Sequence, residues 1–440
     1  MGAAASALEN VNMEEEKFDE DACAKLVEYA QQNYQDDTVK AAIESESEDI
    51  FAKRVEILRA VERVARKQLP APANLVGLIE TSIITLPLGA KKPDESDSDE
   101  EMNTDLQTIC SESIISGIPE QVFTKSLLMK LTLKGNDLQK GIPADIQKLK
   151  SLRSLDVSEC GLGSLPDELC SLSKLETLIA SENSLKALPD ALGSLKSLET
   201  LILYKNQLAS IPGNIGELEN LSEVNLFNNK LKKLPQSMAN LQNLTELNVG
   251  SNKLMTLPST KQWGKIETLT ASFNNIVMLR DFGGMPALSK LQINKNPLEE
   301  IPDDAFDQCG DSLDIVNLSS LRISKIPSSL GKSSSVTQLN LSSCAITEVI
   351  SFAACTNLQI LNLSSNKLTS LHGLGFASLG NLKTIMGSDN AGIVDVPDDV
   401  LKCTNLSRFL MRGCSLADEC LAKLAGLEKQ CKDKKGRFMV

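Results

Sequence analysis

The sequence predicts an α/β solenoid in which short parallel strands stack one per repeat. Three observations predict this fold. The chain has 440 residues, which is long for one conventional globular domain. Aromatic residues make up only 3% of it, which suits a core of stacked aliphatic rungs. A pattern of leucines also recurs every 22 to 25 residues, mostly every 23.

The recurring pattern is L-x-x-L-x-L-x-x-N-x-L, and it can be placed thirteen times, from Leu128 to Leu406. The clearest copy runs from Leu198 to Asn220. Its alternating Leu201 and Leu203 predict a short strand with an inward apolar face. The pattern therefore predicts a leucine-rich-repeat horseshoe with a parallel concave sheet over residues 106–427, preceded by a small helical segment.

The polar positions of the repeat predict its turns. The Asn after each strand, as in Asn206, can satisfy backbone groups between rungs, and Cys160, Cys344 and Cys414 occupy the same position. We therefore expect these cysteines to be structural. A proline falls fourteen residues after the start of seven copies, as at Pro212, which predicts the first turn of a short convex helix.

The ends of the array need caps, because a terminal repeat cannot bury its own apolar face. The partial copy over 109–122 is the candidate N-terminal cap, and Leu421, Leu424 and Leu427 are the candidate C-terminal cap. We expect residues 428–440 to form a loose basic tail. Ahead of the array, we expect disorder over 1–18, a helical segment over 19–70 and an acidic flexible linker over 71–105.

The net charge of −13 comes entirely from the N-terminal quarter. Residues 1–105 hold 24 Asp and Glu against 11 Lys and Arg, which leaves 34 of each for the rest. Such a distribution argues against a nucleic-acid partner, because phosphate binding needs a clustered basic surface. No signal peptide or membrane span is evident, and the eleven cysteines contain no C-x-x-C pair. We therefore expect reduced thiols and a cytoplasmic protein.

The residues that catalysis usually needs are scarce. His372 is the only histidine, which removes His-dependent triads and most general-base schemes. The stretch Leu330–Ser333 resembles the end of a phosphate loop, but Ile326 stands where that loop needs glycine. Acid pairs such as Asp303 and Asp304 fall in expected convex turns. We therefore predict a protein that is not an enzyme and has no metal or other cofactor.

The solvent-facing strand positions carry the functional prediction. The positions in repeats three to seven include five large apolar side chains, namely Ile179, Ile202, Tyr204, Phe227 and Phe273. Glu182, Lys205 and Glu223 are the nearest charged neighbours, and Asp156, Glu159, Glu246, Lys290 and Lys295 extend the rim. We predict a partner-binding patch here. Two alternatives stay open: the rings lie flat over adjacent rungs, or the N-terminal helices cover them. The Asn and Ser positions of repeats nine to eleven are interpreted as consensus residues without a binding role.

The first six residues match the N-myristoylation pattern M-G-x-x-x-S, which predicts acylation of Gly2. One acyl chain binds membranes only marginally, and the nearby Glu14, Glu15 and Glu16 would be repelled by anionic lipid. The expected membrane contact is therefore weak.

The half-repeat L-P-x-x-L-x-x-L, as in 188–195, resembles the intracellular Ras-group leucine-rich-repeat proteins, including the plant Ras-group relatives and the repeat regions of Scribble and Erbin. The resemblance implies a scaffold or adaptor in signalling, often with small GTPases or phosphatase complexes as partners. A regulatory subunit of a protein phosphatase is the alternative, although the repeats of that type are nearer 22 residues and usually lack the L-P step. An enzymatic N-terminal segment is disfavoured, because residues 1–105 hold no histidine and one cysteine.

Overall fold

The computed structural model describes residues 107–109, 117–118, 120–309 and 311–440. The predictions for 1–18, 19–70 and 71–105, including Gly2 and the covering of the sheet by N-terminal helices, lie outside these residues. The chain divides into two compact units, Met1–Leu175 and Glu176–Val440, and each is described by itself.

The described part of the first unit contains three parallel strands, paired in chain order. Leu131 and Leu155, the middle residues of β2 and β3, are register partners and lie in the buried core together with apolar residues of the 3-10 turns. The strands are β1 (Gln107–Ile109), β2 (Lys130–Thr132) and β3 (Ser154–Asp156), and the 3-10 turns are η1 (Glu120–Thr124), η2 (Ala144–Lys148) and η3 (Asp167–Ser171).

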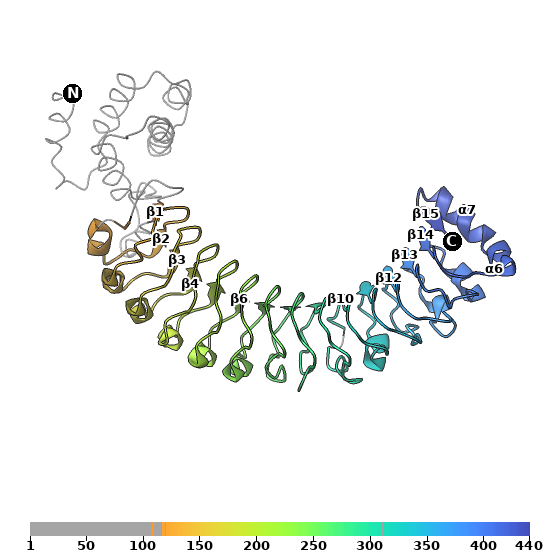
Figure 1. The fold of residues 1–440 in the computed structure, drawn as a ribbon, viewed down its shortest axis with the longest axis horizontal. Coiled ribbons are helices and arrows are strands. Elements are labelled where there is room, and N and C mark those ends of the chain that lie inside the picture. The colour runs from red at the N-terminus through yellow and green to blue at the C-terminus, as the bar shows by residue number, and fades with distance from the viewer. Residues whose placement is uncertain (1–106, 110–116, 119, 310) are drawn as a thin grey trace, which may run out of the picture. The chain divides into compact units, whose positions relative to one another are not determined.

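The second unit continues the same plan, with each strand parallel to the next. Figure 1 shows its strands along the inner side of a curve and its 3-10 turns along the outer side. The strands are β4 (Thr177–Ile179), β5 (Thr200–Ile202), β6 (Glu223–Asn225), β7 (Glu246–Asn248), β8 (Thr268–Thr270), β9 (Lys290–Gln292), β10 (Ile315–Asn317), β11 (Gln338–Asn340), β12 (Ile360–Asn362), β13 (Thr384–Met386), β14 (Arg408–Leu410) and β15 (Arg437–Met439). The 3-10 turns are η4 (Leu192–Ser194), η5 (Gly213–Glu217), η6 (Gln236–Asn240), η7 (Ser328–Lys332), η8 (Phe376–Ser378) and η9 (Asp398–Lys402).

The predicted leucine-rich-repeat solenoid with a parallel sheet is confirmed. Each strand has three residues, and in β2 to β14 the middle side chain is buried in the core, as Leu201 of β5 is. The outer two, Thr200 and Ile202, are partly exposed, so the face of the sheet away from the core is available to solvent. No helix among the described residues is long and apolar enough to cross a membrane.

In many repeats the Asn after the strand binds neighbouring rungs together. The side-chain nitrogen of Asn206 donates to the carbonyls of Ala180, at 2.9 Å, and Leu203, at 3.1 Å. Its oxygen accepts the backbone N–H of Leu185 at 3.0 Å. One buried amide therefore satisfies three backbone groups on two rungs, which would otherwise be costly to bury.

The cysteines at this position play the structural part expected of them. The Cys344 thiol lies 3.3 Å from the Leu318 carbonyl oxygen, and the Cys414 thiol lies 3.3 Å from that of Gly387. In the first unit, the Cys160 thiol lies 3.0 Å from the carbonyl oxygen of Leu133. Burial raises the pKa of Cys160 to about 11, so its reactive thiolate is disfavoured.

The prolines start the convex turns, but not as expected. Pro212 and Pro235 stand directly before η5 and η6, as the residue that caps each turn, instead of in its first turn. The turns are also 3-10 rather than α-helical. The Pro212 carbonyl accepts a hydrogen bond from Ile215 three residues on, which closes the tighter turn at once.

The C-terminal end corrects the sequence prediction. Residues 428–440 are not a loose tail, because helix α7 (Ala425–Asp433) follows helix α6 (Asp418–Lys423) and leads into β15. β15 pairs with β14, and the Phe438 ring stacks on that of Phe409 with centroids 5.5 Å apart. Gly436 makes this approach possible, because a Cβ there would collide with the Ser407 carbonyl oxygen. Of the predicted cap leucines, Leu424 and Leu427 are buried and Leu421 is exposed.

Candidate functional site

The exposed face of the sheet in the second unit carries the predicted apolar patch. Ile179 of β4 and Ile202 of β5 are register partners, and both are partly exposed. Tyr204 follows β5, and its carbonyl accepts a hydrogen bond from the backbone N–H of Glu182 at 2.9 Å. The backbone ladder therefore continues past the strands and fixes the spacing of these side chains between neighbouring rungs.

Phe227 is attached one rung further on and is partly exposed. A Cβ built on Gly250, on the next rung, would lie 3.3 Å from the Phe227 ring, so the ring lies over that glycine. The alternative that the rings lie flat over adjacent rungs therefore describes Phe227 in part. Its ring rests on the adjacent rung and is still partly exposed to solvent. The small residue at 250 is what leaves room for it.

Phe273 is separated from Phe227 by the rung that carries β7. Half of its surface is exposed, which makes it one of the most exposed large apolar residues of the second unit. Its backbone is left-handed, with φ of 57°, a conformation that is unfavourable for a bulky residue. The Lys295 ammonium lies 4.3 Å from the ring centroid, which fits a cation–π contact on the exposed face.

The charged rim residues are placed around this patch. The Lys205 ammonium binds the Glu182 carboxylate at 3.0 Å and lies 5.9 Å from the centre of the Tyr204 ring. Glu223 of β6 and Glu246 of β7 are register partners. Burial, together with the neighbouring Glu246 carboxylate, raises the pKa of Glu223. The structure therefore brings Ile179, Ile202, Tyr204 and Phe227 together with Glu182 and Lys205, and leaves Phe273 and Lys295 as a separate pair.

The Asn and Ser positions of repeats nine to eleven are engaged in local hydrogen bonds. The Asn317 side-chain oxygen accepts the Ser319 backbone N–H at 3.1 Å and its hydroxyl at 2.8 Å. Asn340 and Ser342 repeat both contacts at 3.1 Å and 2.8 Å. These local turns account for the side-chain oxygens of Asn317 and Asn340 as structural acceptors.

Sequence reasoning missed a second cluster on the same face, at β13 to β15. Met386, Leu410 and Met439 are register partners on three consecutive strands. Arg408 and Arg437 form a parallel row beside them, and both are exposed. The cluster escaped notice because the residues of β15 were assigned to a tail, although Arg437-Phe438-Met439 repeats the x-L-x alternation with Phe in place of Leu.

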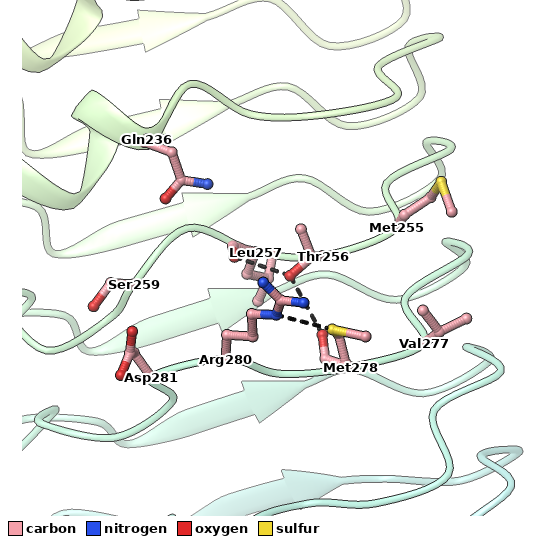
Figure 2. A pocket seen from close by; sticks show the side chains of 9 residues that line it. All are labelled: Gln236, Met255, Thr256, Leu257, Ser259, Val277, Met278, Arg280 and Asp281. Atoms are coloured by element: carbon pink, nitrogen blue, oxygen red, sulfur yellow. Dashed lines mark hydrogen bonds between the residues drawn. The ribbon is translucent and has the colours of Figure 1, made fainter.

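A groove on the side of the solenoid was also missed. Its volume is about 480 Å³, and the residues that line it come from three consecutive rungs (Figure 2). Met255, Val277 and Met278 border it with exposed fractions of 60%, 43% and 42%. Arg280 stands where other copies have proline, and its Nε lies 3.1 Å from the Met278 sulfur. Tabulating the exposed positions after each Asn, and not only the strand positions, would have found it.

His372, the only histidine of the sequence, lies beside an acidic side chain on the surface. The imidazole Nε2 lies 3.5 Å from an Asp395 carboxylate oxygen, and both side chains are substantially exposed. Within the part of the chain that the structure describes, no group of three or more His, Cys, Asp or Glu side chains is placed to hold a metal ion.

Comparison with known families gives two matches. The Leucine rich repeat family matches residues 150–208, and the BspA type Leucine rich repeat region, in six copies, matches residues 280–406. Neither describes a catalytic domain. A search of the curated proteins gave no match.

Solved structures share the fold. A leucine-rich-repeat protein of Leptospira interrogans is 24% identical with a TM-score of 0.53, and the match covers 72% of this chain and 92% of that one. A TDR receptor is 31% identical with a TM-score of 0.61, and the PEPR1–AtPEP1 structure is 28% identical with a TM-score of 0.59. Both of these matches cover 68% of this chain, but only 54% and 44% of theirs. The chain therefore carries a leucine-rich-repeat solenoid, a fold that in general mediates protein–protein interaction.

Proposed function

We propose that this chain is a protein-binding scaffold or adaptor whose main partner docks on the exposed sheet face of the second unit. The patch consists of Ile179, Ile202, Tyr204, Phe227 and Phe273. The observation that carries the proposal is that Ile179, Ile202, Tyr204 and Phe227 are partly exposed on three consecutive rungs of the same face, with the half-exposed Phe273 two rungs further along.

The surroundings of the patch suit a protein partner. A preformed wall of strands binds without the entropy cost of ordering loops. The Glu182–Lys205 ion pair, the Lys295 ammonium and the acidic Glu223 can serve as a polar rim around apolar anchors. At the other end of the same face, Arg408 and Arg437 could bind carboxylates of a partner that extends across the sheet.

The class of partner is drawn from the resemblance to the intracellular Ras-group repeats, which favours a signalling protein such as a small GTPase or a phosphatase complex. The PEPR1–AtPEP1 structure gives a related example in which a similar solenoid is named together with a second component. The regulatory-subunit alternative predicts phosphatase activity that copurifies with the chain, whereas an adaptor for a GTPase predicts nucleotide-dependent copurification.

A cytoplasmic location and acylation of Gly2 belong to the same proposal. A mass spectrum of the N-terminal peptide, taken from chain expressed in eukaryotic cells, tests the acylation. The expected spectrum contains the added myristoyl mass on Gly2, and a spectrum with only the unmodified peptide contradicts this part of the proposal.

The docking surface is tested by comparative affinity purification. We expect Tyr204→Ala combined with Phe273→Asn to lose the main copurifying protein at least tenfold, because two apolar anchors are removed. The matched control is Ser320→Asn with Ser343→Asn, which changes two left-handed residues elsewhere on the same face. Equal recovery by the patch variant and the wild type, measured by quantitative mass spectrometry at equal folding, would contradict the proposed placement.

A further inference from the structure

The side of the solenoid carries an ordered strip of exposed residues. The strip consists of the two positions that lie eleven and twelve residues after each repeat start, as Met255 and Thr256 lie after Leu244. On four consecutive rungs these positions read Lys232-Lys233, Met255-Thr256, Val277-Met278 and Glu299-Glu300. A basic pair is thus followed by two apolar rungs and then by an acidic pair. Figure 2 shows Met255 and Val277 at the ends of neighbouring loops on the same side.

The charged members of the strip are available for contacts with another molecule. Lys232, Lys233, Glu299 and Glu300 are all exposed. In the described part of the second unit, other lysines pair with acids, as Lys261 does with Asp281 at 2.7 Å, but no ion pair involves these four. Between them, Met255, Val277 and Met278 are three of the most exposed large apolar residues of the unit and border the groove of about 480 Å³.

The strip is self-complementary when its order is reversed. A two-fold axis between the rungs of Met255 and Val277 places the basic pair of one copy against the acidic pair of the other. The same axis places the apolar rungs against each other. The same pairing of basic with acidic residues recurs two rungs beyond these charged pairs, where the exposed Lys186 of one copy would face the exposed Glu348 of the other. On the rungs in between, Ala209-Ser210 of one copy would face Ser324-Lys325 of the other, so no two like charges meet there.

We propose that this side strip is the interface of a two-fold symmetric dimer of the chain. Two-fold interfaces use the same patch on both copies, and a patch that runs from basic through apolar to acidic satisfies this requirement. From the rung of Lys186 to that of Glu348, eight rungs at about 4.8 Å spacing extend for about 34 Å. A stable interface buries about 800 Å² per partner, so the surface on both sides of the two-residue strip would be buried as well. The sheet face stays open in such a dimer, so this inference is independent of the proposed function.

The apolar centre of the dimer is tested with the full-length chain by sedimentation velocity. The chain has a mass of 47.6 kDa, and we expect a species of twice that mass to form as its concentration rises through the micromolar range. Met255→Asp with Val277→Asp should weaken self-association at least tenfold, because four carboxylates would meet at the axis. Folding is verified by the unfolding midpoint. A wild-type chain that stays monomeric at 100 µM, or an Asp variant that dimerises like the wild type, overturns the proposal.

The charge order gives a sharper test. Lys232→Glu with Lys233→Glu, and separately Glu299→Lys with Glu300→Lys, should each lose self-association, because like charges would face each other. An equimolar mixture of the two variants should recover the double mass, since every acidic pair then faces a basic pair. Lys367→Glu with Lys402→Glu is the matched control and should dimerise normally. Two variants that lose self-association but do not recover it on mixing would show that the contact is not reciprocal, and would overturn the proposed interface.

Discussion

At the residue scale, the position before each rung-bridging Asn or Cys has a constrained backbone. Glu182, Lys205 and Asn228 have φ values of 55°, 53° and 54° there, and Phe273 has 57°. The left-handed conformation turns the chain out of the strand and aims the next side chain into the core. Asn and Gly tolerate it best, whereas an aromatic residue is strained. At Phe273 the left-handed backbone favours Asn or Gly, whereas the residue present is a half-exposed aromatic ring.

This difference can be measured by comparing Phe273→Asn with Phe273→Ala. Both variants lose the ring and its contact with Lys295, so only the backbone preference separates them. We expect the Asn variant to be more stable than the Ala variant by about 1 kcal/mol in the free energy of unfolding, because Asn adopts the left-handed conformation more readily. Denaturant unfolding measures the difference, and equal stabilities would argue against strain at this position.

The identity of the apolar surface residues could be predicted from the sequence, but their surroundings could not. Tyr204 and Phe227 followed from the alternation of the repeat, because a period of two fixes which positions leave the core. That the Phe227 ring lies over Gly250, and that Lys295 covers Phe273, depends on side-chain directions between residues more than twenty positions apart. The repeat pattern fixes no such directions.

At the element scale, helix α6 is tied to the preceding repeat by an ion-pair cluster. The Lys423 ammonium binds the Asp395 carboxylate at 2.6 Å and that of Asp398 at 3.1 Å. The hydrogen bond from Lys423 is the main reason that the pKa of Asp395 is lowered to about 2. α6 is short and has no capping side chain, so these contacts help to hold it against the solenoid.

The cluster makes the C-terminal cap sensitive to acid. Because the pKa of Asp395 is lower in the folded chain than in the unfolded chain, its contribution to stability is complete above about pH 4 and is lost as the pH falls towards 2. Lys423→Met should therefore destabilise the cap at pH 7 and reduce the loss of stability between pH 4 and pH 2. Amide exchange in α6 and α7 measures both effects. Lys429→Met, on α7, is the control, and a pH profile unchanged by Lys423→Met would contradict this role.

The elements differ in how well the sequence predicted them. Strands β2 to β14 were predicted because a buried apolar residue marks the middle of each one, and the convex turns because prolines precede many of them. β15 was missed because its central residue is Phe438 and it follows a run of lysines, which favoured a tail. The packing that makes it a strand depends on Gly436 beside Ser407, a contact with the preceding rung that no local pattern indicates.

At the scale of the whole molecule, each rung is stabilised mainly by its two neighbours. In the second unit the strands pair only with the preceding and following strands, and the bridging Asn side chains reach one rung back. Repetition made this architecture predictable from sequence alone. The repeat pattern did not predict the side strip. The charge order of the strip becomes visible only when the loop positions of successive rungs are placed next to one another.

Nearest-neighbour stabilisation predicts that loss of the C-terminal cap has a local effect. Removal of 418–440 would expose the buried rung that contains Leu406 and Phe409, because β15 and α7 cover it. We expect amide exchange in β13 and β14 to become at least about tenfold faster, while exchange in β5 to β7 stays unchanged. Hydrogen–deuterium exchange with mass spectrometry resolves the two regions. Uniformly faster exchange over all of 176–417 would mean that the second unit unfolds as one cooperative body, and the additive description of its rungs would then fail.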